Sequence, residues 1–472
     1  MKSFGNIAKD GQVRAVASGA LTDGKAVIVN SDGTVSVVAQ AEGVSDASVF
    51  ESANTTYTSA TFDSNSNKVV IAYSDNGNGE YGTAVVGTVS GSSITFGTPV
   101  VFNSVSSIMH AATFDSNSNK IVIGFRGNGG TGNGSGVVGT VSGTSISFGS
   151  VVVFTSGDCR GFAATFDSNS NKVVFAYTDF SGGSPYHGKA VVGTVSGTSI
   201  SFGSQVEFES NTSNDIDLTF DSNSNKVVVV YRDDSNSSRG AGRVGTVSGT
   251  SISFGSDVIF SSYAVEIVAT FDSNSNKVVI AYTTASSTGE AVVGTVSGTS
   301  ISYGTAVEFY NSYTNGQSIS FDSNLNKVVI SFFDSRIIVG TVSGTSISFG
   351  SVFGPIQVSR FDDLSSTFDS NSNTIVLAYQ DEGNSNYGTS RLYLPNKTTL
   401  TSENFIGFSD GAFATTQSAA INTTNTIDRN QSGLTAGQTY FVQTDGTLGL
   451  TAASPSVTAG TAISSTELIV KG

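Results

Sequence analysis

The stretch TFDSNSNK stands at residues 61–68, and close copies of it return six more times along the 472-residue chain. The first Asp of each copy recurs at intervals of 47 to 54 residues, and we call these residues the anchor positions. They are Asp63, Asp115, Asp167, Asp221, Asp272, Asp322 and Asp369. A steady period of about 50 residues predicts a repeat architecture in which each period forms one supersecondary unit.

Each period reads as four short strands. A second phrase, VGTVSGTSISFG or a near copy, follows each of the first six anchors. In the first period we expect strands at 59–62, 68–73, 84–90 and 93–96, the last continuing toward residue 102. Gly and Asn in the turns supply the positive φ that tight hairpins need. Four antiparallel strands in such a length match a propeller blade, so seven copies predict a seven-bladed β-propeller.

The two ends of the repeat region predict how the ring closes. The seventh period lacks the second phrase and has a divergent third strand at 390–394. The stretch VFESANTTYTSATFD (49–63), which precedes the first anchor, parallels VEFESNTSNDIDLTFD (206–221), a fourth strand that leads into the next blade. The segment near 45–51 is therefore expected to complete the seventh blade. This three-plus-one closure leaves no open sheet edge at the junction.

The composition agrees with an all-β protein and excludes several partners. Val, Thr, Phe and Tyr favour strands, Gly and Asn favour turns, and no long stretch shows helical spacing of apolar residues. The net charge of −15 argues against nucleic acid or an anionic membrane as partner. No apolar run reaches about 18 residues, so no membrane span is expected. The start, MKSFGNIAKDGQ, lacks the apolar segment of a signal peptide, and the single Cys159 cannot form an internal disulfide.

One end of the blades is constant in sequence and the other varies. The DSNSNK and VSGTS turns join strands one to two and three to four, so they lie at the same end. The loops at the opposite end differ in every period, and loops on a rigid scaffold commonly carry function. We predict that this variable end binds a ligand. The candidate residues are Asp75, Tyr81, Met109, His110, Arg126, Asp179, Tyr186, His187, Arg232, Asp233, Tyr263, Tyr313, Asp334, Arg336, Arg360 and Asp381. The alternative is that these residues belong to drifted, solvated loops.

Five of these candidates follow the second strand of their period and leave two interpretations open. They could surround the mouth of the central channel and collect a cation or sugar hydroxyls. They could equally cap turns by accepting backbone N–H bonds, which is the interpretation we favour. The five are Asp75, Asp179, Asp233, Asp334 and Asp381.

Catalytic and metal-binding patterns are weak. DSNSN has the D-x-N-x-N spacing of a calcium loop, but Lys or Thr replaces the expected Gly, and no acidic residue follows at the required distance. Six-bladed sialidases carry Ser-x-Asp-x-Gly-x-Thr-Trp turns, whereas VSGTSISFG lacks both the Asp and the Trp, and no three arginines are grouped. Paired catalytic carboxylates cannot be assigned, and two His with one Cys suggest no nucleophilic triad. We therefore predict no catalytic, metal or cofactor residues.

The chain ends predict a second domain. Each end has an Asp-Gly hairpin, KAVIVNSDGTVSVV (25–38) and QTYFVQTDGTLGL (438–450), preceded by the related phrases LTDG and LTAG. Because the ends of a propeller meet at its closing blade, the flanks are expected to fold together as a small β-sandwich or barrel-like domain. The predicted boundaries are 1–43 and 398–472 for this terminal domain and 44–397 for the propeller inserted into it.

The terminal stretches also resemble a known group of proteins. ENFIGFSDGAFATTQSAAI, with the residues that follow it to the C-terminus, is similar to a module at the ends of tailed-phage virion proteins, including those of marine phages. ASGALTDGKAVIVNSDGTVSVV resembles its first half, and the repeat resembles those of phage and marine bacterial surface proteins. The resemblance implies a non-enzymatic virion surface protein: a capsid-decorating or head-fibre protein, or a tail-associated receptor binder.

Several expectations follow from this resemblance. The terminal domain would attach to capsid or tail proteins, the propeller would face host-surface glycans, and several copies would assemble on one particle. The protein would be assembled in the host cytoplasm and would reside on the virion surface. The alternatives are a purely structural capsid-stabilising protein, a bacterial extracellular adhesin and a sialidase-like glycosidase.

Overall fold

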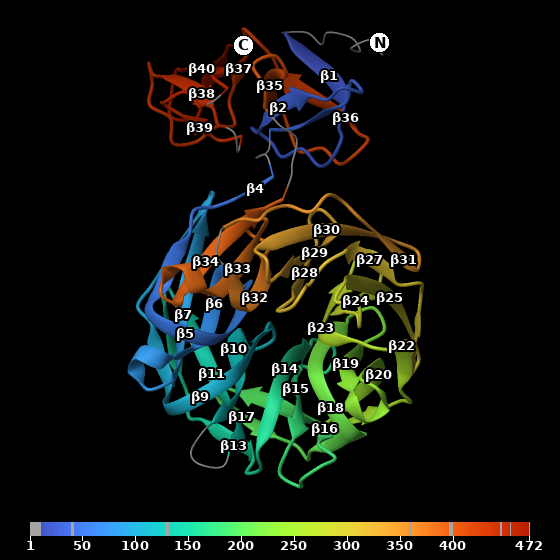
Figure 1. The fold of residues 1–472 in the computed structure, drawn as a ribbon. Coiled ribbons are helices and arrows are strands. Elements are labelled where there is room, and N and C mark those ends of the chain that lie inside the picture. The colour runs from blue at the N-terminus through green and yellow to red at the C-terminus, as the bar shows by residue number, and fades with distance from the viewer. Residues whose placement is uncertain are drawn as a thin grey trace. The chain divides into compact units, whose positions relative to one another are not determined.

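The structure is a computed structural model that describes residues 11–38, 42–127, 132–357, 360–395, 400–443, 446–453 and 455–471. It is an all-β structure with a propeller-like arrangement of sheets (Figure 1). The chain divides into two compact units, residues 44–393, here the repeat domain, and residues 1–43 with 394–472, here the terminal domain. The boundary predicted between residues 397 and 398 lies outside the described residues.

The first strand of every repeat ends at its anchor Asp. We number the repeats 1 to 7 by their anchors. In repeats 1, 2 and 4 the fourth strand of the preceding repeat continues without a break into this first strand. These three strands are therefore much longer than the four-residue strand expected at 59–62. The first strands are β5 (Ser48–Asp63), β9 (Val100–Asp115), β14 (Cys159–Asp167), β18 (Val206–Asp221), β23 (Val265–Asp272), β28 (Ser318–Asp322) and β32 (Phe361–Asp369).

The second and third strands form the centre of each sheet. The second strands are β6 (Lys68–Asp75), β10 (Lys120–Gly127), β15 (Lys172–Asp179), β19 (Lys226–Asp233), β24 (Lys277–Thr283), β29 (Lys327–Phe332) and β33 (Thr374–Asp381). The third strands are β7 (Tyr81–Ser90), β11 (Asn133–Ser142), β16 (His187–Ser196), β20 (Arg239–Ser248), β25 (Gly289–Ser297), β30 (Arg336–Ser343) and β34 (Tyr387–Leu394). Short 3-10 turns η1 (Asn76–Asn78), η2 (Asp234–Asn236) and η3 (Glu382–Asn384) join them in three repeats.

The outer strand is interrupted after the second phrase. Its first piece pairs with the end of the third strand, and its second piece pairs with the start. The first pieces are β8 (Ser93–Phe96), β12 (Ser145–Phe148), β17 (Ser199–Phe202), β21 (Ser251–Phe254), β26 (Ser300–Tyr303) and β31 (Ser346–Phe349). The second pieces are β13 (Val152–Thr155), β22 (Val258–Ser261), β27 (Val307–Tyr310) and the early parts of β5, β9 and β18; β4 (Gly43–Val44) also pairs with β34.

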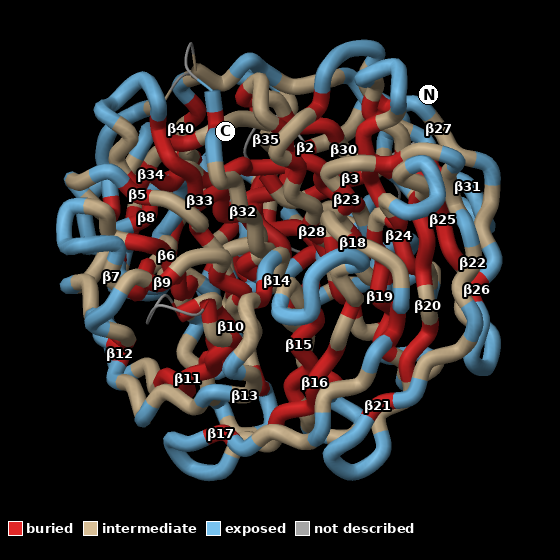
Figure 2. Tube along the Cα trace, turned by 60° about the horizontal axis from the view of Figure 1, so that its bottom comes forward, coloured by how far each residue is buried: buried red, intermediate tan, exposed pale blue. Residues whose placement is uncertain are grey.

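The middle strands hold the core. In β6 every residue from Val69 to Tyr73 is fully buried, because neighbouring sheets cover both faces, and the same pattern returns in the other second strands. Burial on both faces explains why the sequences of these strands are almost continuously apolar rather than alternating. Figure 2 shows buried residues along the strands and exposed residues in the turns. Burying one such Val or Ile side chain contributes roughly 1.5–3 kcal/mol.

The anchor Asp organises its turn in all seven repeats. Its Oδ1 accepts the backbone N–H groups two and three residues later at 2.9 to 3.1 Å. In six repeats a Ser hydroxyl also donates to Oδ2, whereas repeat 6 has Leu325 at that place. The Asn that follows is left-handed, with φ between 53° and 59°. These bonds support the role of a turn scaffold rather than of a calcium loop.

The second phrase packs the repeats against one another at the constant end. A Cβ placed on Gly97 would stand 1.8 Å from the carbonyl oxygen of Thr144 in the next repeat. The same contact joins Gly203 to Thr250, and four of the five such contacts have the same 1.8 Å spacing. Only glycine allows this approach, so its place in the phrase follows from packing between neighbours.

The first and last repeats pair as the sequence predicts. Ser48 pairs with Ser390, Val49 with Thr389 and Glu51 with Gly388, which gives β34 its outer strand. The backbone N–H of Ser45 also donates to the Leu392 carbonyl at 2.9 Å. The N-terminal segment therefore supplies the strand that repeat 7 does not encode.

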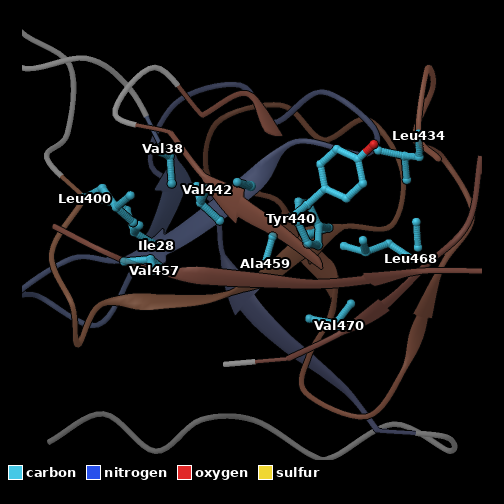
Figure 3. Packing of buried hydrophobic residues seen from close by; sticks show 13 residues of the cluster. Ile28, Val38, Leu400, Leu434, Tyr440, Val442, Val457, Ala459, Leu468 and Val470 are labelled. Atoms are coloured by element: carbon cyan, nitrogen blue, oxygen red, sulfur yellow. The ribbon is translucent and has the colours of Figure 1, made fainter. Parts of the chain in front are cut away.

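The terminal domain combines both ends of the chain in one sheet. Its order is β1-β36-β35-β2-β3, and a second sheet of order β37-β41-β40-β38-β39 comes from the C-terminal segment. The bounds are β1 (Gln12–Val16), β2 (Ala26–Val29), β3 (Val35–Val37), β35 (Phe405–Ser409), β36 (Ser418–Asn422), β37 (Ile427–Asp428), β38 (Thr439–Val442), β39 (Leu448–Gly449), β40 (Thr458–Ala462) and β41 (Leu468–Val470). Ile28, Tyr440, Val442 and Leu468 are among the buried residues that pack the two sheets together (Figure 3).

Both predicted hairpins of the terminal domain are present. β2 pairs with β3, and β38 pairs with β39. Asp445 in the second turn lies outside the described residues, so only the flanking strands of that hairpin are placed.

Candidate functional site

In every repeat a left-handed residue stands six positions before the anchor; it lies within the first strand in six repeats and just before β28 in repeat 6. Its φ lies between 45° and 60°, a region that non-glycine residues rarely adopt. We call these residues the bulge positions. They are Tyr57, Met109, Gly161, Asp215, Glu266, Gly316 and Asp363.

These positions belong to β-bulges. In six of the repeats the pairing between first and second strand shifts at this point, as between Thr56 and Ser59 in repeat 1. A bulge kinks its strand and changes where side chains point, and bulges are common beside functional sites. The left-handed φ is thus shared by all seven repeats and the pairing shift by six of them, while the side chain is aromatic, aliphatic, acidic or absent.

The residues that follow the bulge positions line a cavity of about 360 Å³. Each of the seven first strands contributes two or three of them. The lining segments are 58–60, 110–112, 162–164, 216–217, 267–269, 317–319 and 364–366. Most of their side chains are small or carry a hydroxyl group, and the surface that they and the backbone expose to the cavity is mainly polar.

Hydrogen bonds across this wall join adjacent repeats. The residue two positions after the bulge accepts a backbone N–H from the first strand of the next repeat at 2.8 to 2.9 Å. The pairs are Ser59 with Ala112, Asp217 with Ala269, Ser318 with Ser366, and Ser365 with Ala60. The last pair joins repeat 7 to repeat 1 in the same geometry as the others.

Acidic bulge residues make a second set of such links. Asp215 Oδ2 accepts the Glu266 N–H at 3.1 Å, and Glu266 Oε2 accepts the Gly316 N–H at 3.2 Å. Burial raises the pKa of both carboxyl groups. It raises the pKa of Asp363 and of Asp217 to about 6, because their hydrogen bonds to backbone N–H groups offset only part of the desolvation. These carboxylates therefore hold the first strands together at an energetic cost.

The five aspartates after the second strands do not line the cavity. Asp179 accepts the Ser181 N–H at 2.9 Å, and Asp381 accepts the Gly383 N–H at 3.0 Å, so these two cap turns. Asp233 instead receives bonds from Asn236 and Arg239, and the Asp75 side chain forms no cap bond. Asp334 lies in a turn after the end of β29.

Several polar candidates are held by carboxylate side chains. Arg126 Nε lies 2.8 Å from Asp158, and His187 Nδ1 lies 2.6 Å from Glu207. Arg232 lies 2.7 Å from Asp215, the bulge residue of repeat 4, and 2.6 Å from Asp234. These side chains fix loops to strands of the variable end.

His110 is a packing residue. It is 7% exposed, its Nδ1–H donates to the Tyr57 carbonyl at 3.0 Å, and its ring packs against Phe102 and Phe125. Burial lowers its pKa to about 4, so the ring is neutral near pH 7. Its neighbour Met109 occupies the bulge position.

The remaining candidates fall into an isolated group and a clustered group. Tyr81 begins β7, Tyr263 accepts the Ser261 hydroxyl through its carbonyl, and Tyr186 stacks on Phe180 at 4.0 Å. The second group lies at the variable end of repeat 6 and in the segments that lead into and out of this repeat: Tyr313, Asp334, Arg336 and Arg360. Phe333 contacts both Tyr313 and Arg360 there.

The sequence analysis did not predict the bulge positions or the roles of Phe180 and Phe333. Aligning the repeats on their anchors shows that the sixth preceding residue changes chemistry from repeat to repeat, which is a signal the chain contains. Phe180 and Phe333 adjoin two of the predicted aspartates in sequence, yet nothing in the sequence indicates that arginines stack on them.

The described residues contain no group of three or more His, Cys, Asp or Glu side chains placed to hold a metal ion. Within the same residues, no helix has the length and apolar character needed to cross a membrane.

Comparison with known proteins shows the fold alone. No family model and no curated protein sequence matches the chain. A chain in a crystal structure of a mitotic checkpoint complex is similar over 75% of this chain and 95% of its own, at 11% identity and a TM-score of 0.52. A crystal structure of a protein of unknown function from Dyadobacter fermentans DSM 18053 covers 75% of this chain and 99% of its own, at 11% identity and a TM-score of 0.47.

Proposed function

We propose that this chain is a non-enzymatic virion surface protein of a tailed phage that presents a ligand-binding face. Its terminal domain would be a small β-sandwich that attaches to capsid or tail proteins. The repeat domain, inserted into it, would be a seven-bladed propeller with three-plus-one closure. The ligand would be a molecule of the host surface, most simply a glycan.

One observation carries the binding proposal. All seven repeats keep a left-handed residue six positions before the anchor, and six of them a bulge, around one cavity, while the side chain at this position is Tyr, Met, Gly, Asp or Glu. At the other end of the same strands the anchor turn is nearly identical in every repeat. A surface that keeps its backbone and varies its chemistry suits recognition of one particular ligand, and many copies on a particle would strengthen weak contacts.

Two observations support the fold and the placement. The hydrogen bond between Ser365 and Ala60 repeats the link between neighbouring repeats, as a closed ring of blades requires. Strands from both chain ends form one sheet, which agrees with a single module built from the two stretches that resemble phage virion proteins.

The test uses particles that carry the chain. Electron cryomicroscopy should place the terminal domain on the capsid or tail, with the bulge positions facing solvent. The triple substitution Tyr186→Ala, Tyr313→Ala and Arg360→Ala at the variable end should reduce adsorption to host cells. The matched set Lys120→Ala, Lys226→Ala and Lys277→Ala at the constant end should leave adsorption unchanged.

Three results would overturn parts of the proposal. Equal adsorption of both sets, with fewer intact particles when the chain is deleted, would support a purely structural decoration protein. Packing of the variable end against neighbouring subunits would assign its variation to assembly. Absence of the chain from purified particles would remove the virion assignment.

A further inference from the structure

We infer that the variable end of repeat 6 binds an acidic saccharide through two guanidinium groups and an exposed aromatic ring. This inference rests on the proposed function and names the ligand class for one part of the variable end. We call the site, formed by Tyr310, Tyr313, Phe333, Arg336 and Arg360, the repeat-6 patch. The loop between second and third strands is shortest here, so only three residues separate Phe332 from Arg336.

The arginines of the patch lie over aromatic rings. The Arg360 guanidinium carbon is 4.7 Å from the centre of the Phe333 ring, and that of Arg336 is 5.6 Å from the Tyr310 ring. Tyr313 meets Phe333 edge-on at 6.2 Å and is itself 47% exposed. A stacked guanidinium can bind a carboxylate in its plane at two points. Arg336 Nη1 also donates to the Gly354 carbonyl at 3.3 Å, so its fork is used in part by the protein itself.

The charge of the patch is uncompensated. Among the described residues, neither Arg336 nor Arg360 has a carboxylate within ion-pair distance, and this includes Asp334 in the same turn. The other arginines of the variable end, such as Arg160 and Arg232, are paired with aspartates. In a chain with a net charge of −15, a pair of unneutralised arginines on aromatic rings indicates an anionic ligand.

The backbone under the patch is fixed from both sides. The Phe333 N–H donates to the Asn315 carbonyl at 3.0 Å, and the Phe333 carbonyl accepts the Phe361 N–H at 3.1 Å. The Ser335 carbonyl accepts the Ile356 N–H at 2.8 Å. The turn is thus bonded to the segments that lead into and out of repeat 6. A preformed site spends less free energy on ordering when it binds.

The chemistry favours a saccharide over a nucleic acid. Tyr313 offers an exposed ring on which the apolar face of a sugar can pack, and a uronic acid carboxylate matches the fork of a guanidinium. A nucleic acid needs an extended basic surface, and a net charge of −15 does not favour one. The saccharide would therefore carry its carboxylate next to the arginines and its ring against Tyr313.

The experiment titrates the full chain with trigalacturonate and with the neutral galactotriose. Trigalacturonate should bind at least about tenfold more tightly, and raising the salt concentration should weaken it. Arg360→Ala should weaken trigalacturonate binding about tenfold or more, since it removes a charge-assisted pair. Arg360→Lys should recover only part of this loss, because lysine lacks the planar fork.

Arg160→Ala is the matched control. Arg160 also stacks on a phenylalanine, 4.4 Å from the Phe180 ring centre, but it lies 3.3 Å from Asp158. Its substitution should leave trigalacturonate binding unchanged. Equal losses for Arg160→Ala and Arg360→Ala would overturn the inference, because diffuse charge would then explain the binding.

Other outcomes separate this inference from the proposed function. If the chain binds host cells but neither trisaccharide, the repeat-6 patch is wrongly assigned and the binding function stands. If it binds neither cells nor saccharides, the proposed function fails as well. If a dT10 oligonucleotide binds more tightly than trigalacturonate and loses affinity in Arg360→Ala, the ligand class is wrong.

Discussion

The repeat domain contains two sets of left-handed residues, one residue of each set per repeat. The residue type is constant in one set and varies in the other. At the constant end the residue is Asn in all seven repeats, with φ between 53° and 59°. At the bulge positions φ has nearly the same range, 45° to 60°, yet five residue types occur. A left-handed φ therefore does not by itself restrict a position to one residue type.

The difference lies in what holds each shape. The turn is held locally, because the anchor Asp accepts N–H groups from its own turn and Asn tolerates the left-handed region. The bulge is held by neighbouring strands and by links such as that between Asp215 and Glu266. Tertiary contacts meet the cost of strain there, which leaves the side chain free to vary.

The largest effect is expected from removing an anchor. Asp221→Ala should lower the free energy of unfolding by about 3 kcal/mol, because two backbone N–H groups and the Ser224 hydroxyl lose their acceptor. Ser224→Ala, which removes one of these bonds, should cost about 1 kcal/mol. Urea denaturation measures both. If the two variants lose the same stability, the anchor is not the centre of the turn.

The packing contact of the second phrase offers a comparison within the constant end. Gly203→Ala should cost about 2 kcal/mol or more, because the new Cβ would stand 1.8 Å from the Thr250 carbonyl oxygen. At Gly350 the nearest atom would be 3.8 Å away, so Gly350→Ala should be tolerated. Melting temperatures of the two variants test this. Equal shifts in melting temperature would show that the contact between repeats is not what restricts this position to glycine.

The pH dependence of stability probes the cavity wall. Burial raises the pKa of Asp217 to about 6, above the value of an unfolded chain, so the folded state binds the proton more tightly. Its contribution to stability should therefore increase by about 1 kcal/mol as the pH falls from 7 to 5. Asp217→Asn should remove this part of the slope in denaturation at several pH values. An unchanged slope would mean that Asp217 titrates normally.

The smallest effects are expected at the ends of the second strands. Asp381→Ala should cost about 1 kcal/mol, since the Gly383 N–H loses its cap. Asp75→Ala should change stability by less than about 0.5 kcal/mol, because the Asp75 side chain makes no cap bond. Denaturation midpoints resolve the difference. A larger loss for Asp75→Ala would indicate a role for this carboxylate in the folded protein that its hydrogen bonds do not show.

What the sequence predicts well is what local chemistry fixes. The strand pattern, the left-handed Asn and Gly of the turns and the pairing of residues near 45–51 with β34 all follow from short phrases. The bulge at Met109 or Glu266 does not, because no local residue preference creates it. Binding by the candidate residues stays a prediction. Tyr313 and Arg360, both named from the sequence, contact Phe333, whose part in this cluster follows only from the placement of the segments before and after repeat 6.

The pairing of β5 with β34 has a consequence for the nascent chain. The first half of β5 emerges from the ribosome early, but its partner Tyr387 follows Asn54 by 333 residues. At synthesis rates of about 5–20 residues per second, this segment waits on the order of half a minute for its partner. During that time it is an unpaired strand edge, open to the same segment of another nascent chain. We therefore expect strand exchange between copies to increase when many chains are synthesised close together, and dilute expression to favour pairing of β5 with β34 of the same chain.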